Sequence, residues 1–205
     1  MTRTAEDLRV EDKLVVVFDI CSSSNIIEDL SLTASLKAMR NLLISIKRFL
    51  REKSGELGFE LYKFTGDGWI LLFAPDTGGR TLMGLLADLS KLFHDRVNSD
   101  ILPRLETKPQ LVGITFGVDR GPLVKMTMMR KEEYIGRPLN IACRLQNAIK
   151  DKDPHPQYKV LMSNHVFVSF SEDLRRYRPR RVTRTLRNIR GGQKYECVKL
   201  DIPIR

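Results

Sequence analysis

Two carboxylates lie where strand-like apolar runs end. Asp19 directly follows the β-branched run 14–18, and Asp67 lies in the tripeptide Gly66-Asp67-Gly68 between two apolar runs. If these runs are neighbours in one sheet, the two acids meet at one end of it and attract divalent cations, which prefer hard oxygen ligands. A two-metal site would stabilise both oxygens of a phosphoryl displacement. On spacing alone, a helix-capping acid and a plain turn residue are the commoner interpretation.

A second polar pair, Asn140 and Arg144, is spaced four residues apart in a segment with helical periodicity. Residues at i and i+4 share one helical face, so both side chains project together. The apolar residues Ile141, Leu145 and Ala148 fall on the other side as packing. A guanidinium fork suits negative charge developing on a transferred phosphoryl group. The alternative for Arg144 is a surface salt bridge, which the wider sequence context disfavours.

The hydrophobic pattern predicts the elements that must position these residues. Strands are expected at 14–18, on both sides of the Asp67 tripeptide within 59–73, at 111–118 and 123–129 with a turn at 119–122, at 160–162, at 182–186 and at 195–200. Helices are expected from the serines at 22–24 to about Gly55, around 82–92, from Pro138 to about 150, and after 163–164. The Asp-Gly pair between two β-type runs is a strong hairpin signal.

This order of elements, β-α-β-β-α-β-β-α-β-α-β-β, predicts an α+β fold. Paired strands between helices favour helices that cover one face of a mainly antiparallel sheet, with a ferredoxin-like core. A chain of 205 residues is long enough for one well-buried core. No internal repeat, low-complexity tract or linker divides it, so residues 1–205 are expected to form a single domain.

Composition indicates a globular protein, with 42% hydrophobic and 29% charged residues. No apolar run approaches the roughly 20 residues that span a bilayer, so no membrane association is expected. Residues 1–13 alternate charged and polar side chains, which argues against a signal peptide. The three cysteines are scattered and lack metal-ligand spacing, as in proteins of a reducing cytosol. A cytoplasmic location is therefore expected.

The net charge of +10 points to a polyanionic partner, either nucleic acid or a nucleoside triphosphate. A solvated basic face is the weightier interpretation of the basic run as a whole. Only Tyr177 interrupts that run with an aromatic ring, which weakens the case for a platform that stacks single-stranded bases. The arginines of the run are Arg175, Arg176, Arg178, Arg180, Arg181, Arg184, Arg187 and Arg190.

Four motifs follow one another over most of residues 14–170. They are Phe18-Asp19-Ile20 with the serines after it, the segment 63–68 (Lys-Phe-Thr-Gly-Asp-Gly), the segment 114–117 with Gly121-Pro122, and the segment 134–145 (Tyr-Ile-Gly-Arg-Pro-Leu-Asn-Ile-Ala-Cys-Arg-Leu). A lone Gly-Asp-Gly would carry little weight. Four motifs in this order and spacing resemble those of class III adenylate and guanylate cyclases, and so imply a class III nucleotide cyclase catalytic domain.

The resemblance implies a set of catalytic roles. Asp19 and Asp67 would hold two divalent ions, Mn²⁺ or Mg²⁺, with the carbonyl of Ile20 assisting. One metal would lower the pKa of the ribose 3′-hydroxyl and the other would bind the triphosphate. Asn140 would orient the ribose, and Arg144 would stabilise the transition state. In this family the aspartates and the Asn/Arg pair come from different subunits, so a head-to-tail homodimer with two composite sites is implied.

The resemblance also assigns substrate-binding positions. Lys63 matches the lysine that reads the purine in adenylate cyclases, and the position of its usual Asp or Thr partner falls on Glu133. That glutamate leaves the identity of the base open. Arg190 falls where the family places a phosphate-binding lysine near the C-terminus, and Lys194 is a rival for this role.

A narrower resemblance concerns the segments 19–30 and 62–73. With Ser23-Ser24 in place of the usual Phe-Thr, these segments resemble the bacterial Pycsar pyrimidine cyclases. This implies UTP or CTP as the substrate, and a cyclic UMP or cyclic CMP signal that activates a cyclic-nucleotide-sensing effector protein in antiphage defence.

Three alternatives bear on this assignment. Lys63 supports an ordinary adenylate cyclase. A catalytically silent nucleic-acid-binding domain on the same fold would explain the arginine run, but it leaves the four polar residues of the motifs as coincidence. A diguanylate cyclase is disfavoured, because Gly66-Asp67-Gly68 lacks the paired acids that follow in that family.

Overall fold

The computed structural model describes residues 8–107, 109, 111–150 and 154–204. The first seven residues, part of the segment in which no signal peptide is expected, lie outside this description. Within the described residues eight strands form one sheet, in the order β2-β3-β1-β4-β6-β8-β7 with β5 paired to β4. The strands are β1 (Arg9–Cys21), β2 (Glu60–Phe64), β3 (Trp69–Phe73), β4 (Gly113–Met128), β5 (Lys131–Ile135), β6 (Lys159–Ser163), β7 (Arg180–Arg184) and β8 (Tyr195–Asp201).

The sheet is mainly antiparallel, as the sequence predicts, with β4 and β6 as its parallel pair. The helices are α1 (Ser23–Leu32), α2 (Leu36–Leu57), α3 (Gly79–Arg96), α4 (Arg137–Lys150) and α5 (Asn164–Leu174). The first four strands with α1, α2 and α3 form a β-α-β-β-α-β unit in the spatial order β2-β3-β1-β4, which is the ferredoxin-like arrangement. The α+β prediction is confirmed. None of the described helices is long and apolar enough to cross a membrane.

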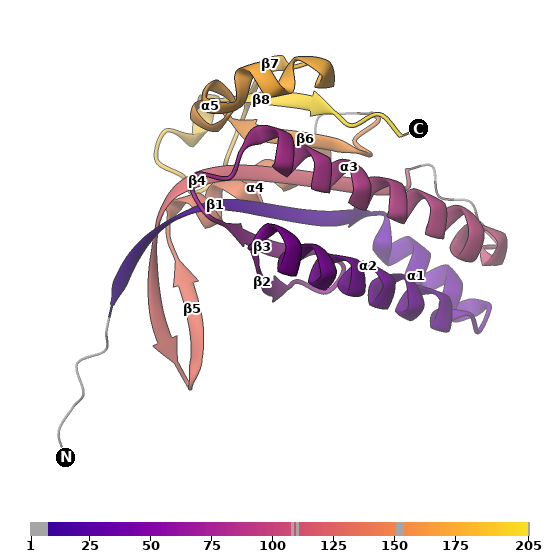
Figure 1. The fold of residues 1–205 in the computed structure, drawn as a ribbon. Coiled ribbons are helices and arrows are strands. Elements are labelled where there is room, and N and C mark those ends of the chain that lie inside the picture. Colours follow the sequence, from indigo (N-terminus) through magenta and orange to yellow (C-terminus); the bar gives the residue numbers. More distant parts are fainter. Residues whose placement is uncertain (1–7, 108, 110, 151–153, 205) are drawn as a thin grey trace.

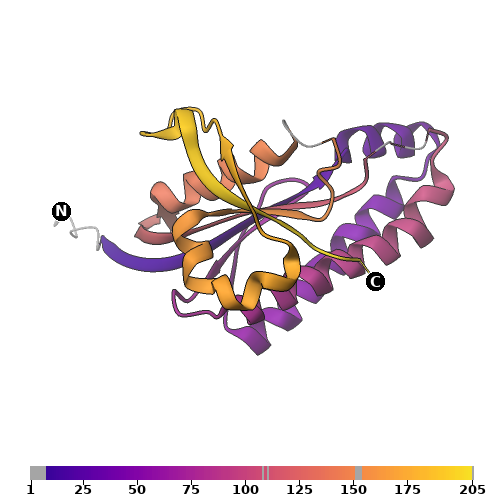
Figure 2. The ribbon, with the colours of Figure 1, turned by 90° about the horizontal axis from the view of Figure 1, so that it is seen from above.

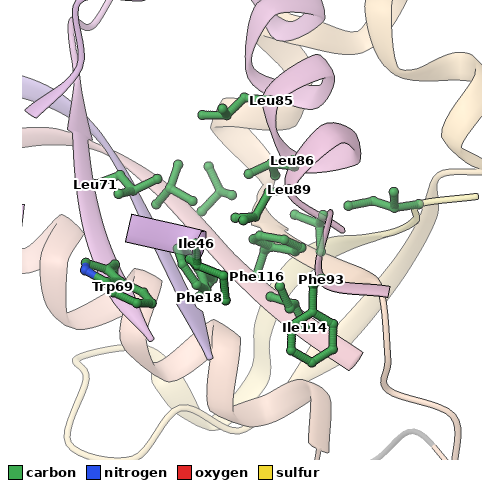
Figure 3. Packing of buried hydrophobic residues seen from close by; sticks show 14 of the residues in the cluster. Phe18, Ile46, Trp69, Leu71, Leu85, Leu86, Leu89, Phe93, Ile114 and Phe116 are labelled. Carbon is green, nitrogen blue, oxygen red and sulfur yellow. The ribbon is translucent and has the colours of Figure 1, made fainter. Parts of the chain in front are cut away.

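Strand β1 lies in the middle of the sheet, and its residues 14–18 are buried on both faces. Its side chains alternate between the faces, because successive residues of a strand point in opposite directions. Phe18 packs with Trp69 and Phe116 in the main core, at ring-centroid distances of 5.5 and 5.9 Å (Figure 3). Val15 and Val17, which alternate along the strand with the residues of the main core, belong to a smaller cluster on the other face. Asp19 belongs to this second set by alternation, so its carboxylate faces away from the main core.

Helices cover both faces of the sheet, not one face as the sequence pattern suggests. The helices α2, α3 and α5 lie on the main-core side, and α4 lies on the opposite side (Figures 1 and 2). Gly117 of β4 makes the close approach of α4 possible, because a Cβ there would come within 2.0 Å of the Ala142 carbonyl oxygen. The fold therefore places the helix with Asn140 and Arg144 on the same face as Asp19.

The predicted turn at 119–122 is wrong. Strand β4 runs straight through these residues, because β1 is longer than the apolar run predicts and pairs with them, with Val15 opposite Asp119 and Asp12 opposite Pro122. The chain reverses later, at Met129 and Arg130, whose φ values of 49° and 66° suit a tight two-residue hairpin. The end of β4 and β5 project from the body as an arm (Figure 1).

The long helix predicted after residues 22–24 is two helices. The chain breaks between α1 and α2 at Ala34, whose φ is 54°. The second helix ends at Gly58 (φ 70°) instead of Gly55, because the left-handed conformation that terminates a helix favours glycine. The amphipathic pattern continues across the break, so periodicity alone does not reveal it.

Candidate active site

The hairpin that carries Asp67 lies directly against the end of β1. The last paired residues of β1 and β3 are Phe18 and Trp69. Beyond them, a Cβ on Gly68 would lie 1.9 Å from the Phe18 carbonyl oxygen and 3.0 Å from the Cα of Asp19. Only glycine permits this approach. The structure therefore brings the segment with Asp67 to the same end of the sheet as Asp19.

The turn itself is held by hydrogen bonds. The amide of Thr65 donates to the carbonyl of Gly68 over 3.0 Å, and Gly66 adopts a φ of 108° that favours glycine. The hydroxyl of Ser23, at the start of α1, donates to the Asp67 carboxylate. Ser23, one of the two serines that follow Asp19, thus orients the carboxylate of Asp67.

The backbone at Asp19 is linked to α4 through two buried polar residues. The side-chain amide of Gln146 donates a hydrogen bond to the Thr115 hydroxyl over 2.8 Å. The Thr115 hydroxyl in turn donates to the Asp19 carbonyl oxygen over 3.5 Å. Gln146 and Thr115 are 3% and 0% exposed, so the contact is shielded from water. The side chain of Ile20 is a hydrocarbon buried in the main core, so the carbonyl oxygen is the one metal ligand that this residue offers.

The donor set fits Mg²⁺ or Mn²⁺. Two carboxylates and a peptide carbonyl are hard oxygen ligands, which these ions prefer over nitrogen or sulfur. Among the described residues no group of three or more His, Cys, Asp or Glu side chains could hold a metal. An ion at Asp19 and Asp67 would therefore complete its coordination with water and substrate phosphates, which is the usual way in which proteins bind Mg²⁺.

Lys63 and Glu133 form an ion pair, although 70 residues separate them. The Nζ of Lys63 lies 3.3 Å from Oε2 of Glu133, and the hydroxyl of Tyr62 donates to the same oxygen over 2.6 Å. The Tyr62 hydroxyl in turn accepts the amide N–H of Tyr134 over 2.9 Å. The sequence analysis did not single out Tyr62, because the residues around it do not show that Glu133, 71 positions later in the chain, lies next to it.

These contacts shift two pKa values in opposite directions. The hydrogen bond from Tyr62, and then the contact with Lys63, lower the pKa of Glu133 below its ordinary value of 4.5. Burial, followed by the hydrogen bond to Glu133, raises the pKa of Tyr62 to about 12. At neutral pH Glu133 is thus a carboxylate that accepts the hydrogen bond, and Tyr62 is a neutral phenol that donates it.

Asn140 and Arg144 lie on α4, as expected from the helical spacing. Asn140 is exposed in the first turn, and its Nδ2 lies 3.3 Å from the Gly136 carbonyl oxygen. Arg144 is half-buried and lines a groove of about 260 Å³ between α4 and the β7–β8 loop, residues 185–194. The groove is lined by Arg144, Asn147, Ala148, Thr185, Leu186 and Arg187.

Arg144 faces the β7–β8 loop of its own chain. The groove that it lines is completed by Thr185, Leu186 and Arg187 of this loop. The loop follows β7 at one edge of the sheet, whereas the Asp67 hairpin joins β2 and β3 at the other edge. The structure thus groups Asp19 with the Asp67 segment and Lys63 with Glu133, and it groups Arg144 with Arg187.

The basic residues near the C-terminus have different environments. The side chain of Arg190 is exposed. The backbone carbonyl oxygen of Arg190 accepts a hydrogen bond from Nη2 of Arg137 over 3.1 Å. Lys194 is exposed in the short 3-10 helix Gly192–Lys194. Arg187 shares the groove with Arg144. The sequence shows Arg187 only as one member of an arginine run, because the fold of the loop decides which member reaches the groove.

Similar solved structures cover almost the whole chain. The adenylyl cyclase CyaB from P. aeruginosa matches with a TM-score of 0.69 at 16% identity, over 97% of this chain and 98% of that one. The chain has the fold of a class III nucleotide cyclase catalytic domain. The guanylyl cyclase Cya2 matches with a TM-score of 0.67 at 14% identity, over 98% of this chain and 95% of that one.

An adenylate/guanylate cyclase/hydrolase from Silicibacter pomeroyi also shares this class III cyclase fold. Its TM-score is 0.64 at 15% identity, over 95% of this chain and 99% of that one. No family profile matches the chain, and no curated protein sequence matches it. At such low identities the likeness concerns the fold, and the site residues must carry any statement about the chemistry.

Proposed function

We propose that this protein is a metal-dependent nucleotide cyclase that converts a nucleoside triphosphate into the 3′,5′-cyclic monophosphate and diphosphate. The observation that carries the proposal is the contact of Gly68 with Phe18 and Asp19, which brings the Asp67 hairpin to the end of β1. Two carboxylates brought to one end of adjacent strands, on a class III cyclase fold, offer the hard oxygen ligands that divalent ions prefer. The single domain acts in the cytoplasm, where its substrate is made.

The residues divide the reaction between them. Asp19, Asp67 and the Ile20 carbonyl would hold two divalent ions, which supply Lewis-acid activation of the ribose 3′-hydroxyl and charge neutralisation at the triphosphate. Asn140 orients the ribose through its amide. Arg144 donates hydrogen bonds to the phosphoryl oxygens, on which negative charge develops.

A second copy of the chain supplies the Asn140–Arg144 pair. The orientation of Arg144 supports this division, because its groove is formed with the β7–β8 loop at one edge of the sheet and the Asp67 hairpin lies at the other edge. In a head-to-tail homodimer, each of two sites would combine the carboxylates of one chain with α4 of the other.

The proposed substrates are UTP or CTP. Glu133 accepts and Lys63 donates hydrogen bonds, and both uracil and cytosine offer a donor beside an acceptor. The resemblance of segment 19–30 to pyrimidine cyclases supports this choice, and the contact of Ser23 with Asp67 gives its serines a task in the site. The cyclic nucleotide would activate an effector protein in antiphage defence.

Adenylate cyclase activity is the second candidate. Adenine also offers an amino donor beside a ring acceptor, so the pair formed by Lys63 and Glu133 suits it as well. The base pocket alone does not separate the two candidates, and product analysis must do so.

The deciding experiment incubates the purified protein with Mn²⁺ and each of ATP, GTP, CTP and UTP, and identifies products by mass spectrometry. Cyclic UMP or cyclic CMP is the expected main product. Cyclic AMP would keep the chemistry and overturn the base preference. No cyclic product from any nucleotide, with a dimeric protein, would contradict the proposed function. Stronger polynucleotide binding after chelation of metal would then favour a silent nucleic-acid-binding domain.

Asp67→Asn tests the role of the carboxylates. We expect turnover to fall by about 10³-fold or more, because the loss of a metal removes several kcal/mol of charge stabilisation. Asp12→Asn is the matched control, since Asp12 is an exposed aspartate of the same sheet, far from the hairpin along β1. Equal activity of both variants would remove Asp67 from the site.

A further inference from the structure

Two backbone hydrogen bonds close the β7–β8 loop on itself. The amide of Leu186 donates to the Gly192 carbonyl over 2.7 Å, and the amide of Gly192 donates to the Ile189 carbonyl over 2.8 Å. A Cβ on Gly192 would lie 2.1 Å from the Leu186 carbonyl oxygen, so the closure requires glycine. The loop is thus closed by its own backbone hydrogen bonds.

Apolar packing and a hydrogen bond attach the loop to α4. Leu186 is buried in one cluster with Ile141 and Leu145 of the helix, and the partly buried Ile189 packs against the same cluster. At the other end, the guanidinium of Arg137 donates to the Arg190 carbonyl oxygen over 3.1 Å. Arg137 is the first residue of α4, so this bond joins the tip of the loop to the start of the helix.

A buried acid lies beneath this second contact. Asp119 of β4 is 2% exposed, and its Oδ1 lies 3.2 Å from Nε2 of His165. Burial raises the pKa of Asp119, whereas Ser163, His165 and Arg137 act in the opposite direction. The proposed reaction gives Asp119 no task. The Arg137 guanidinium is thus one of the groups that oppose the effect of burial on the pKa of Asp119.

Arginines of the loop and of the helix lie close to one another. Arg144 and Arg187 line one groove. The guanidinium of Arg137 contacts the backbone of Arg190, so the bond uses the carbonyl dipole of Arg190 and leaves its charged side chain exposed.

We propose that Arg137 is a positioning residue, which ties the Arg190 carbonyl to the start of α4 and so keeps Arg187 in one groove with Arg144 for binding a polyphosphate. The assignment rests on the proposed function for the identity of the substrate, but not for the anion site itself. Arg187 contacts the phosphate chain directly. Arg137 acts on it only through the loop.

The test measures binding of inorganic tripolyphosphate by calorimetry, without any nucleotide. Arg187→Ala and Arg137→Met should each weaken binding about tenfold, and Arg137→Gln, which keeps an N–H donor, should recover part of the loss. The double variant Arg137→Met/Arg187→Ala should bind no more weakly than Arg187→Ala, because a positioning residue has no effect once its target is removed. Arg181→Met, which removes an exposed arginine of β7, controls for net charge.

The outcomes separate the two proposals. Additive losses in the double variant, or equal losses for Arg137→Gln and Arg137→Met, would overturn the positioning role. Tripolyphosphate binding that none of the variants changes relative to Arg181→Met would overturn the anion site. If the binding pattern holds while no nucleotide is cyclised, the proposed function fails and the positioning role stands. Hydrogen exchange of the loop amides gives a further readout. The exchange rate should rise in Arg137→Met, which loses the bond that holds the loop, and it should not rise in Arg187→Ala, which keeps this bond.

Discussion

Gly68 lies so close to Phe18 that a single methyl group would collide with the Phe18 carbonyl oxygen at 1.9 Å. This contact, between a hairpin and the first strand, sets the position of the Asp67 segment relative to Asp19. The position depends on the absence of a side chain, and it can be tested by adding one.

Gly68→Ala should destabilise the fold and reduce activity together. The added Cβ meets backbone atoms, which cannot move aside as a flexible side chain does, so we expect a loss of about 1–3 kcal/mol or more in the free energy of unfolding. Urea unfolding measures this loss, and the slope of the transition should stay constant. Gly84→Ala is the control, since no atom lies within 4 Å of a Cβ at that position in α3. Equal stability of both variants would contradict the contact.

Mixed dimers test whether the site is composite. Asp19→Asn and Arg144→Ala should each be inactive alone. Mixed in equal amounts, they should recover about one quarter of wild-type activity, because half of the dimers are mixed and each of these has one intact site out of two. No recovery in dimers shown to be mixed, for example by differential tagging, would count against sites shared between subunits.

Tyr62→Phe tests the hydrogen bond to Glu133. Because Tyr62 is the largest cause of the lowered pKa, the pKa of Glu133 should rise toward 4.5 in the variant, as measured by ¹³C NMR of the carboxyl group. A lowered pKa stabilises the fold above pH 4.5, and this contribution is lost as pH falls through the folded-state pKa. The difference in stability between the two proteins should therefore shrink below pH 4.5.

Two observations complete the Tyr62 test. Glu133→Gln should lower the pKa of Tyr62 from about 12 toward 10.0, seen as earlier phenolate absorbance on titration with base. Tyr195, whose pKa is also raised to about 12 mainly by burial, is the internal reference and should not move. An unchanged Glu133 pKa in Tyr62→Phe would show that Lys63 alone holds the carboxylate.

Thr115→Val tests the buried link between Asp19 and α4. The substitution keeps the shape but removes the acceptor of Gln146, so a buried amide group loses its partner. We expect a cost of about 1–3 kcal/mol in the free energy of unfolding. Thr183→Val, at an exposed position of β7, should cost little. The double variant Thr115→Val/Gln146→Leu should recover part of the stability, and a further loss in it would contradict the account.

Local patterns predicted most of the elements and the fold class. Alternation and helical periodicity respond to burial, so the strands at 69–73 and 195–201 and the start of α4 were found within a few residues. The turn at 119–122 was misplaced because Gly121-Pro122 is a turn signal in isolation. In the fold, the N-terminal end of β1 pairs with these residues and keeps them extended.

The site divides in the same way. The sequence by itself determined which groups are present, since Asp19, Asp67, Asn140 and Arg144 occur in motifs whose spacing is local. Tertiary structure alone decided that Gly68 places the hairpin against Phe18, that Tyr62 contacts Glu133, and that Arg187 of the arginine run shares the groove with Arg144. These contacts join residues far apart in the sequence: Gly68 and Phe18 are 50 positions apart, Tyr62 and Glu133 are 71 apart, and Arg144 and Arg187 are 43 apart. Chain reversals set such contacts, and no local pattern records which strand becomes the neighbour of another.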